Sequence, residues 1–371
     1  MTSPALEVAG FTCAEAQAAG AARGVKAEAA RRAYRAAFAS PDGGGLFTAD
    51  ALPVARSLQE GELTKFVLSV GGGLEVESVV IPMWRGGESW HSLCLSSQVG
   101  CRMDCTFCET AQLGLLRNLT PGEIVGQVLA ARRATNADIR KLVFMGMGEP
   151  FDNFESVVQA IRVLTDPVGL SLSKRQITIS TVGRVAGIRR LAELNWRYLQ
   201  LAVSLNAPND EIRSRIMPIN RAEPMAALRA AMLDYPLRRN GYFMIGYVLI
   251  PGVNDAVEHA RELAAFLEPV RCCVNVIPYN PRLESPWPAP DEAGITAFLG
   301  ALRDAGQYCK RRVTKGRDLM AACGQLGNRS LARRKRDPAP FPDAASCGRG
   351  DRPCGSLVSL NALRPTVDAT Q

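Results

Sequence analysis

The sequence predicts an α/β protein whose core is a partial (β/α)6 barrel, with a small helical module before it and a disordered tail after it. Short apolar runs alternate with amphipathic segments through the middle of the chain, which is typical of parallel strands joined by helices. The length of 371 residues and the hydrophobic content of 47% allow one large core and a smaller accessory element. We therefore expect an enzyme-sized, folded protein.

The chain divides into four expected regions. They are an N-terminal helical accessory module at residues 1–64, a β-hairpin extension at 65–86, the barrel core at 87–328 and a basic, proline-containing, disordered tail at 329–371. In the first region, alanine-rich sequence between Ala27 and Phe38 places bulky residues on one helix face and arginines on another. In the second, residues alternate with period two on both sides of glycines 71–73, as in a hairpin.

Six apolar runs are expected to form the parallel strands of the core. They are Ser92–Ser96, Leu142–Met147, Gln176–Ser180, Leu199–Leu205, Phe243–Ile250 and Cys272–Ile277. Thr120, Pro121 and Glu123 have the pattern of an N-cap, a first-turn proline and a capping-box acid, so the first helix of the core is predicted to begin there. In parallel barrels, functional side chains lie at the carboxyl ends of the strands.

Charge and cysteine usage limit the compartment and the partners. The net charge of +8 is compatible with a polyanionic partner, although a charge of this size is also common as a surface feature alone. The eleven cysteines show no disulfide framework, and neither a signal peptide nor an apolar run of membrane-spanning length is found, so we expect a reducing cytoplasm and no membrane. Cys347 and Cys354 lack a second ligand pair, which favours unpaired thiols over a zinc site.

With only His91 and His259 present, histidine-based mechanisms have little support.

Cys101, Cys105 and Cys108 form a CxxxCxxC loop directly after the first expected strand. Cysteine thiolates hold iron-sulfur clusters. Three such ligands, with no fourth cysteine close behind, can bind three irons of a 4Fe-4S cluster and leave one iron open to a substrate. A structural zinc loop or a chance spacing is the alternative interpretation.

This spacing, with Phe107 before the last cysteine, resembles the radical S-adenosylmethionine (SAM) superfamily. The resemblance implies a radical SAM barrel in which the open iron binds the methionine part of SAM and an electron from the cluster cleaves SAM to a 5′-deoxyadenosyl radical. Residues 145–150 (MGMGEP) follow an expected strand and look like the turn that binds the SAM amine in that superfamily. Taken alone, this segment would be an ordinary strand-to-helix turn.

Four longer motifs narrow the resemblance. Residues 93–101 (LCLSSQVGC), the turn at 148–149, residues 207–213 (APNDEIR) and residues 321–326 (AACGQL) together are similar to the RlmN/Cfr family of RNA adenosine methyltransferases. The similarity runs from about Glu77 to Gly327. It implies RNA (rRNA, tRNA or both) as partner, an electron donor such as flavodoxin or ferredoxin, and two SAM molecules per turnover, one as methyl donor and one as radical source. We expect a monomer.

The resemblance also implies three catalytic side chains. Cys323 would be methylated first, and the carbon of its S-methyl group, after losing hydrogen to the radical, would join adenine C2 or C8. Glu77 would remove the ring proton, and Cys94 would attack the sulfur of Cys323 and form a transient disulfide. Without the resemblance, Cys323 would be uninformative, Cys94 would be a buried packing residue and Glu77 would lie on a solvated hairpin face.

For SAM, the resemblance gives a set of binding positions at strand ends. They are Gly148, Glu149, Ser180, Ser204, Leu205, Asn206 and Asn280. The family usually has histidine where this chain has Asn206, so a backbone contact would survive there and a side-chain role would change. The remaining cysteines of the first 328 residues, Cys13, Cys272, Cys273 and Cys309, match no motif and are expected to serve packing.

Three functions follow from these observations. The first is an RNA methyltransferase acting on an adenine carbon, with C2 favoured over C8 because the RlmN type is the commoner one. The second is a radical SAM activase, or another radical enzyme, that acts on protein or small molecules and forms no methylcysteine. The third is an RNA-binding protein with a structural metal and no catalytic activity, which only the basic composition favours.

Overall fold

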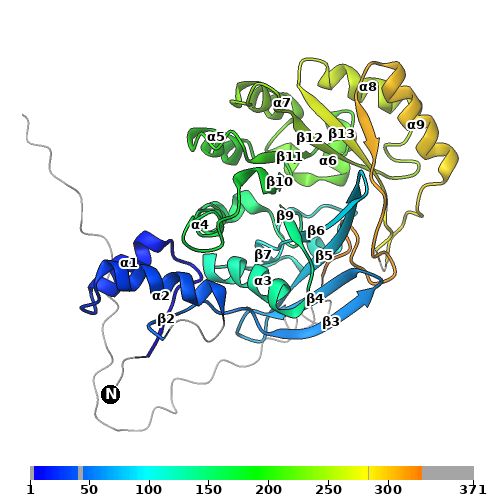
Figure 1. The fold of residues 1–371 in the computed structure, drawn as a ribbon. Coiled ribbons are helices and arrows are strands. Elements are labelled where there is room, and N and C mark those ends of the chain that lie inside the picture. Colours follow the sequence, from blue (N-terminus) through cyan, green and yellow to red (C-terminus); the bar gives the residue numbers. More distant parts are fainter. Residues whose placement is uncertain (1–3, 41–44, 283, 328–371) are drawn as a thin grey trace, which may run out of the picture. The chain divides into compact units, whose positions relative to one another are not determined.

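The computed structural model of the chain describes residues 4–40, 45–282 and 284–327. The expected tail at 329–371, with Cys347 and Cys354, lies outside the described residues. The main sheet has ten strands: β3 (Val54–Glu60), β4 (Leu63–Ser69), β5 (Glu75–Arg85), β6 (Glu88–Cys94), β9 (Ile139–Phe144), β10 (Ile177–Thr181), β11 (Gln200–Ser204), β12 (Phe243–Leu249), β13 (Cys272–Pro278) and β14 (Cys309–Arg311). Their order across the sheet is β14-β13-β12-β11-β10-β9-β6-β5-β4-β3 (Figure 1).

Within the main sheet, the strands from β6 to β14 are parallel, and each one pairs with the next strand of this sheet along the chain. The helices between them lie on the outer face of the curved sheet (Figure 1): α3 (Pro121–Ala134), α4 (Phe154–Leu164), α5 (Val185–Glu193), α7 (Met225–Asp234), α8 (Val257–Leu267) and α9 (Glu292–Asp304). Each of the six expected strands overlaps an observed parallel strand, so the partial barrel is confirmed. Because the strands are parallel, their carboxyl ends share one edge of the sheet.

The core explains why the strands are nearly continuous apolar runs. Side chains of the strands and of the covering helices are fully buried together, among them Ile179, Val203, Ile245, Val274, Ile161, Ile188, Leu263 and Phe298. Strands that are covered on both faces need apolar residues at successive positions. The first helix, α3, begins as predicted: the Thr120 hydroxyl accepts a hydrogen bond from Glu123 N–H, and the Glu123 carboxylate accepts one from Thr120 N–H.

Three antiparallel strands extend the sheet on its other side. The hairpin of β4 and β5 around glycines 71–73 is confirmed. Strand β3, which pairs with β4, was not expected, because all of its residues are exposed and the segment has no alternation of apolar and polar positions. The boundary expected between residues 64 and 65 falls inside β4, so the three strands form one unit of the sheet.

The N-terminal module contains α1 (Cys13–Ala21), α2 (Ala27–Ala39) and a short parallel pair, β1 (Leu6–Glu7) with β2 (Phe47–Thr48). Tyr34 of α2 is buried, and its hydroxyl donates a hydrogen bond to Phe11 O over 2.8 Å. Arg31, Arg32 and Arg35 lie on the exposed face of the same helix, as the sequence pattern predicted. The core of the module is continuous with the core of the barrel.

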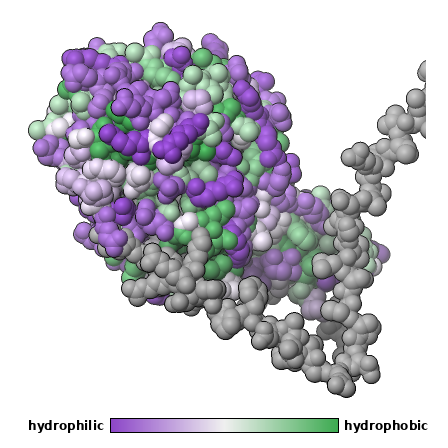
Figure 2. Space-filling model, turned by 180° about the vertical axis from the view of Figure 1, so that it is seen from behind, coloured by the Kyte–Doolittle hydropathy of each residue, from purple (hydrophilic) through white to green (hydrophobic). Residues whose placement is uncertain are grey.

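Figure 2 shows the molecule from behind, where hydrophobic side chains occur in patches among hydrophilic ones. In the part of the chain that the structure describes, no helix has both the length and the apolar character needed to cross a membrane.

Candidate active site

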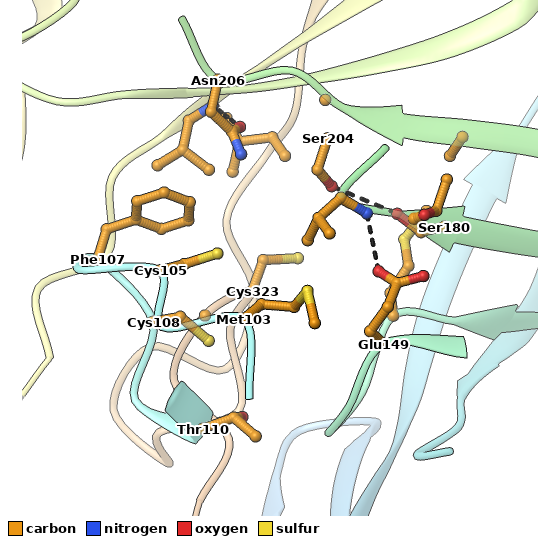
Figure 3. A pocket seen from close by; sticks show the side chains of 18 of the residues that line it. Met103, Cys105, Phe107, Cys108, Thr110, Glu149, Ser180, Ser204, Asn206 and Cys323 are labelled. Carbon is orange, nitrogen blue, oxygen red and sulfur yellow. Dashed lines mark hydrogen bonds between the residues drawn. The ribbon is translucent and has the colours of Figure 1, made fainter. Parts of the chain in front are cut away.

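The carboxyl ends of the parallel strands border a pocket of about 170 Å³. Nine of the expected site residues line it: Cys101, Cys105, Cys108, Gly148, Glu149, Ser180, Ser204, Asn206 and Cys323. Figure 3 shows the thiols of Cys105, Cys108 and Cys323 on one side of this pocket, and Glu149 with Ser180 on the opposite side. The fold therefore brings together residues that are more than 200 positions apart in the sequence.

The cysteine loop lies between β7 (Gln98–Gly100) and the short 3-10 helix η1 (Thr110–Leu113). Strand β7 pairs with β8 (Leu115–Asn118), which holds the two ends of the loop together. Gly100 has a φ of +76°, and a Cβ there would lie 1.8 Å from the carbonyl oxygen of Gly114, so only glycine fits. The tip of the cysteine loop, at Thr106, is held by two hydrogen bonds. Thr106 N–H donates to Ile216 O, and Arg282 Nε donates to Thr106 O.

The three thiols of this loop are free and face a largely apolar pocket. Burial raises the pKa of Cys101 to about 12 and also raises the pKa values of Cys105 and Cys108, so bound metal must supply the positive charge that favours the thiolates. Among the described residues, no three His, Cys, Asp or Glu side chains converge on a single metal ion. In a 4Fe-4S cluster each cysteine binds a different iron, so three separated sulfurs fit that cluster better than zinc.

The turn after β9 is packed against the segment that leads into the cysteine loop. Gly148 has a φ of +100°, and a Cβ there would lie 2.6 Å from Cβ of Gln98. A Cβ on Gly146 would lie 2.7 Å from Leu95 O. The backbone N–H of Glu149 donates to the Gln98 side chain over 2.8 Å. Glycine at both positions therefore lets this turn pass directly beside the entrance to the cysteine loop.

Glu149 is the buried carboxylate of the pocket. One of its oxygens accepts a hydrogen bond from Phe151 N–H over 3.0 Å, and the other accepts one from Val182 N–H over 2.8 Å. Despite these bonds, burial raises the pKa of Glu149 to about 7. A cationic ligand in the pocket would favour the ionised form, so this carboxylate is suited to bind an ammonium group.

Polar groups at the ends of β10 and β11 complete this side of the pocket. The hydroxyl oxygens of Ser180 and Ser204 lie 3.5 Å apart. Asn206 follows β11 in a left-handed conformation with a φ of +58°, which asparagine tolerates better than most residues. Its side-chain oxygen accepts a hydrogen bond from Val248 N–H, and its amide donates to the sulfur of Met217. The Asn206 side chain thus holds the end of β11 to β12.

Two expected SAM-binding residues, Leu205 and Asn280, do not line the pocket. Leu205 is fully buried in the core, and its carbonyl oxygen accepts a hydrogen bond from Arg213 Nε. Asn280 is buried as well, and its side-chain oxygen accepts a hydrogen bond from Arg317 Nε over 3.3 Å. Both residues therefore support neighbouring segments.

Cys323 lies in a segment that we call the C-terminal loop, residues 316–327. The loop packs on the cysteine loop, because Glu109 N–H donates to Gly324 O over 2.7 Å and the Thr110 hydroxyl donates to Leu326 O. The side-chain amide of Gln325 donates to Pro281 O over 3.0 Å. These contacts place Cys323 at the wall of the pocket, where it is partly exposed.

Cys94 and Glu77 lie next to this loop without lining the pocket. Burial, and then the charge of Cys323, raise the pKa of Cys94 to about 12. Glu77 is buried, and its carboxylate accepts a hydrogen bond from Gly327 N–H over 2.9 Å. The expectation of a solvated Glu77, drawn from strand alternation alone, is wrong because the C-terminal loop covers that face of the hairpin. Cys94 and Cys323 are both free thiols.

Several residues of the site were not expected from the sequence. Arg312 and Asn275 line the pocket, and the positive charge of Arg312 lowers the pKa of Cys94 against the effect of burial. Four methionines add apolar lining: Met103, Met145, Met217 and Met244. Arg213, fully buried behind the pocket, has its pKa lowered by burial to about 10. The only sequence feature that could have pointed to Arg213 is its place in the motif at residues 207–213.

Comparisons with known proteins show the family of this chain. Residues 95–266 match the radical SAM superfamily. Over 284 residues, which cover 76% of this chain and 78% of the relative, the chain is 45% identical to "Probable dual-specificity RNA methyltransferase RlmN 1" of Protochlamydia amoebophila (strain UWE25). The chain belongs to the RlmN/Cfr family of radical SAM methyltransferases. A second member of the family, "Dual-specificity RNA methyltransferase RlmN" of Campylobacter jejuni, is 41% identical over 72% of this chain and 78% of that protein.

A solved structure shows the same fold. The crystal structure of a radical SAM methyltransferase from Sphaerobacter thermophilus has a TM-score of 0.80 and 37% identity, and covers 86% of this chain and 99% of that chain. Membership of the RlmN/Cfr family implies a 4Fe-4S cluster and SAM. The three free thiols of the cysteine loop fit the cluster, and the buried carboxylate of Glu149 fits the SAM amine.

Proposed function

We propose that this protein methylates an adenine carbon of RNA, at C2 in preference to C8, in 23S rRNA, tRNA or both, and that Cys323 carries the methyl group. The observation that supports this most directly is the place of Cys323, a free, partly exposed thiol that lines the same pocket as the three cysteines of the cluster loop. RNA as the substrate is supported by the names of the relatives, and C2 by their RlmN type.

Cys323 acts first as a nucleophile. Its thiolate takes the methyl group of one SAM by displacement at carbon, which leaves a thioether on the chain. Cys101, Cys105 and Cys108 would hold the cluster, which would supply the one electron needed to cleave a second SAM to the 5′-deoxyadenosyl radical. Loss of a hydrogen atom from the S-methyl group lets its carbon bond to the adenine ring, so Cys323 holds the RNA covalently.

Glu77 and Cys94 release the product in this proposal. Glu77 takes the proton from the adenine carbon, and the Cys94 thiolate attacks the sulfur of Cys323. The bond between that sulfur and the bridging carbon breaks, the carbon takes up a proton and becomes the methyl group of the product, and a Cys94–Cys323 disulfide forms. The unpaired electron left by the radical step would return to the cluster, and a thiol reductant restores both cysteines. Because burial raises the pKa of Cys94, this thiol keeps its proton in the resting enzyme, and the charge of Arg312 helps to form the thiolate.

Five pocket residues bind SAM in this proposal. Gly148 and Glu149 bind the amine, and Ser180, Ser204 and the backbone at Asn206 bind the carboxylate and ribose. Leu205 and Asn280 contribute from behind the pocket wall through their contacts with Arg213 and Arg317. The stoichiometry is two SAM molecules per turnover.

The partners follow from the same chemistry. A one-electron donor such as flavodoxin or ferredoxin reduces the cluster, and the protein acts as a monomer in a reducing cytoplasm. The exposed arginines of α2, Arg31, Arg32 and Arg35, contribute to binding of RNA phosphates, so affinity for RNA falls steeply with added salt.

Nucleoside mass spectrometry tests this function. The full-length chain is reconstituted anaerobically with iron and sulfide and is given reductant, SAM and either 23S rRNA or tRNA. We expect 2-methyladenosine with the wild-type chain, none with Cys323→Ala, and wild-type yield with Cys272→Ala, a matched variant at a partly buried cysteine of β13.

Three other outcomes of this assay would contradict parts of the proposed function. An active Cys323→Ala variant would show that the methyl group does not pass through this residue. Formation of 8-methyladenosine would overturn the assignment to C2. Release of 5′-deoxyadenosine with no methylated RNA would point to a radical enzyme with a different substrate.

A further inference from the structure

Lys65 and Glu77 form a buried ion pair behind the C-terminal loop. Nζ of Lys65 lies 3.1 Å from Oε1 of Glu77, and each side chain is 6% exposed. Every other ion pair that joins two of the described residues has at least one side chain that is 29% or more exposed. Burying two charges is costly and adds little stability over an apolar pair, so the presence of this pair calls for another explanation.

The register of the hairpin brings these two charges together. Val67 of β4 pairs with Glu77 of β5, and Lys65 pairs with Val79. Lys65 and Glu77 therefore lie on a diagonal of the same sheet face, within reach of each other's side chains. The C-terminal loop covers this face.

Both members of the ion pair also bind the C-terminal loop. Lys65 Nζ donates hydrogen bonds to the carbonyl oxygens of Met320, at 3.0 Å, and Leu319, at 3.4 Å. The second carboxylate oxygen of Glu77 accepts a hydrogen bond from Gly327 N–H. Cys323 lies between these two attachment points along the chain. The pair thus holds the loop on both sides of the cysteine.

The loop depends on such contacts because it has no helix or strand of its own. Met320 takes a left-handed conformation with a φ of +51°, which is unfavourable for a residue with a side chain other than glycine, asparagine or aspartate. Its carbonyl is the one that Lys65 binds at 3.0 Å. Lys65 therefore stabilises a loop conformation that the backbone alone would not favour.

We propose that Lys65 is a positioning residue, which holds Glu77 and the C-terminal loop in a fixed relation until Glu77 takes up a proton. The inference rests on the proposed function for the roles of Glu77 and Cys323. When the proton of the adenine carbon moves to the Glu77 carboxylate, Glu77 becomes neutral and Lys65, still an ammonium, loses its counter-ion. The hold on the loop weakens, and Cys323 gains the freedom to meet the thiol of Cys94.

Hydrogen-deuterium exchange of the full-length chain, without SAM or RNA, tests this inference. Glu77→Gln imitates the neutral carboxyl and keeps an acceptor for Gly327 N–H. We expect amide exchange in peptides that cover residues 316–327 to become about tenfold faster, while peptides of β10 to β13 keep their rates. Lys65→Met/Glu77→Leu leaves no unpaired charge, so it folds if a single variant does not, and it should show the same local increase.

Arg56→Met is the matched control, because it removes an exposed ion pair with Glu75 in the same antiparallel strands. It should leave exchange in the C-terminal loop unchanged. Unchanged exchange of the loop in Glu77→Gln and in the double variant would overturn the inference, and so would an equal increase in all peptides, which would show general loosening. These exchange results do not depend on methylation, so failure of the proposed function, seen in the nucleoside assay, is distinguishable from failure of the ion pair to hold the loop, seen in exchange.

Turnover gives a second readout that a purely structural role would not produce. Lys65→Gln keeps a hydrogen-bond donor for Met320 O and removes the charge beside Glu77. We expect kcat for RNA methylation to fall about a hundredfold with an unchanged KM for RNA, because positioning of reacting groups is lost and RNA binding is not. A rise in KM with unchanged kcat would overturn the positioning role.

Discussion

The two sides of the pocket are built differently. Glu149 follows β9, and Ser180 and Ser204 lie at the carboxyl ends of β10 and β11. The side chains of these strands fill the main core, so the positions of all three residues depend on the packing of the whole barrel. Cys323 lies in the C-terminal loop, which is held by hydrogen bonds and one buried ion pair. The strand side, which contains Glu149, is therefore expected to be as rigid as the fold, whereas the loop side, which contains Cys323, is expected to move more easily.

A substitution that disturbs the strand side of the pocket, which contains Glu149, Ser180 and Ser204, should also destabilise the whole fold. Arg213 of α6 (Asp210–Ile216) is fully buried and donates to Leu205 O, Val182 O and the side chain of Asn220. Arg213→Leu leaves these acceptors unpaired, and we expect it to lower the free energy of unfolding by about 5 kcal/mol. Urea denaturation measures this loss. The exposed Arg215→Leu on the same helix should cost less than about 0.5 kcal/mol, and a similarly small loss for Arg213→Leu would contradict this account.

A second prediction concerns the electrostatics of the strand side. The pKa of Glu149 is about 7 in the folded chain, against 4.5 for the free group, so the folded state binds this proton more tightly. The contribution of Glu149 to the free energy of unfolding is fully present below pH 4.5. It falls by about 3 kcal/mol as the pH rises to 7. Glu149→Gln removes this dependence.

The measurement is a comparison of urea denaturation for the SAM-free wild-type chain and Glu149→Gln at pH 5, 6, 7 and 8. The difference between the two free energies of unfolding should grow in favour of the glutamine variant up to pH 7 and then level off. Saturating SAM brings positive charge to the carboxylate and should flatten the wild-type curve. If the unfolding free energies of the two SAM-free proteins changed in parallel with pH, the raised pKa of Glu149 would be refuted.

These contrasts explain what could be predicted from the sequence. The parallel strands were found because burial on both faces requires apolar runs, and the start of α3 was found because its cap is local. Strand β3 was missed because an exposed edge strand carries no alternation, and β14 because it has three residues. Regular packing leaves a signal in sequence, whereas exposed or very short elements leave little.

The residues of the site also divide into those that could be predicted from the sequence and those that could not. Glu149 and the cysteine loop could be placed because each lies shortly after an expected strand, and Cys323 because it lies in a recognisable motif. The pairing of Lys65 with Glu77 could not be found, since it depends on a loop 250 residues away that covers the hairpin. Arg312 lines the pocket directly after the end of β14, a strand that was not predicted.

The smallest expected loss of stability comes from the loop side. Gln325→Met removes the hydrogen bonds of Gln325 with Pro281 O and Ala322 N–H at nearly constant volume, and should cost about 1 kcal/mol of unfolding free energy. Because these bonds position Cys323, we expect kcat for RNA methylation to fall about tenfold while the Kd for SAM stays unchanged. Gln307→Met, at a side chain whose contacts lie outside the pocket, is the matched control and should alter neither quantity. If Gln325→Met weakened SAM binding as much as turnover, the two sides of the pocket would be coupled, and the division between a rigid strand side and a separately held loop would have to be abandoned.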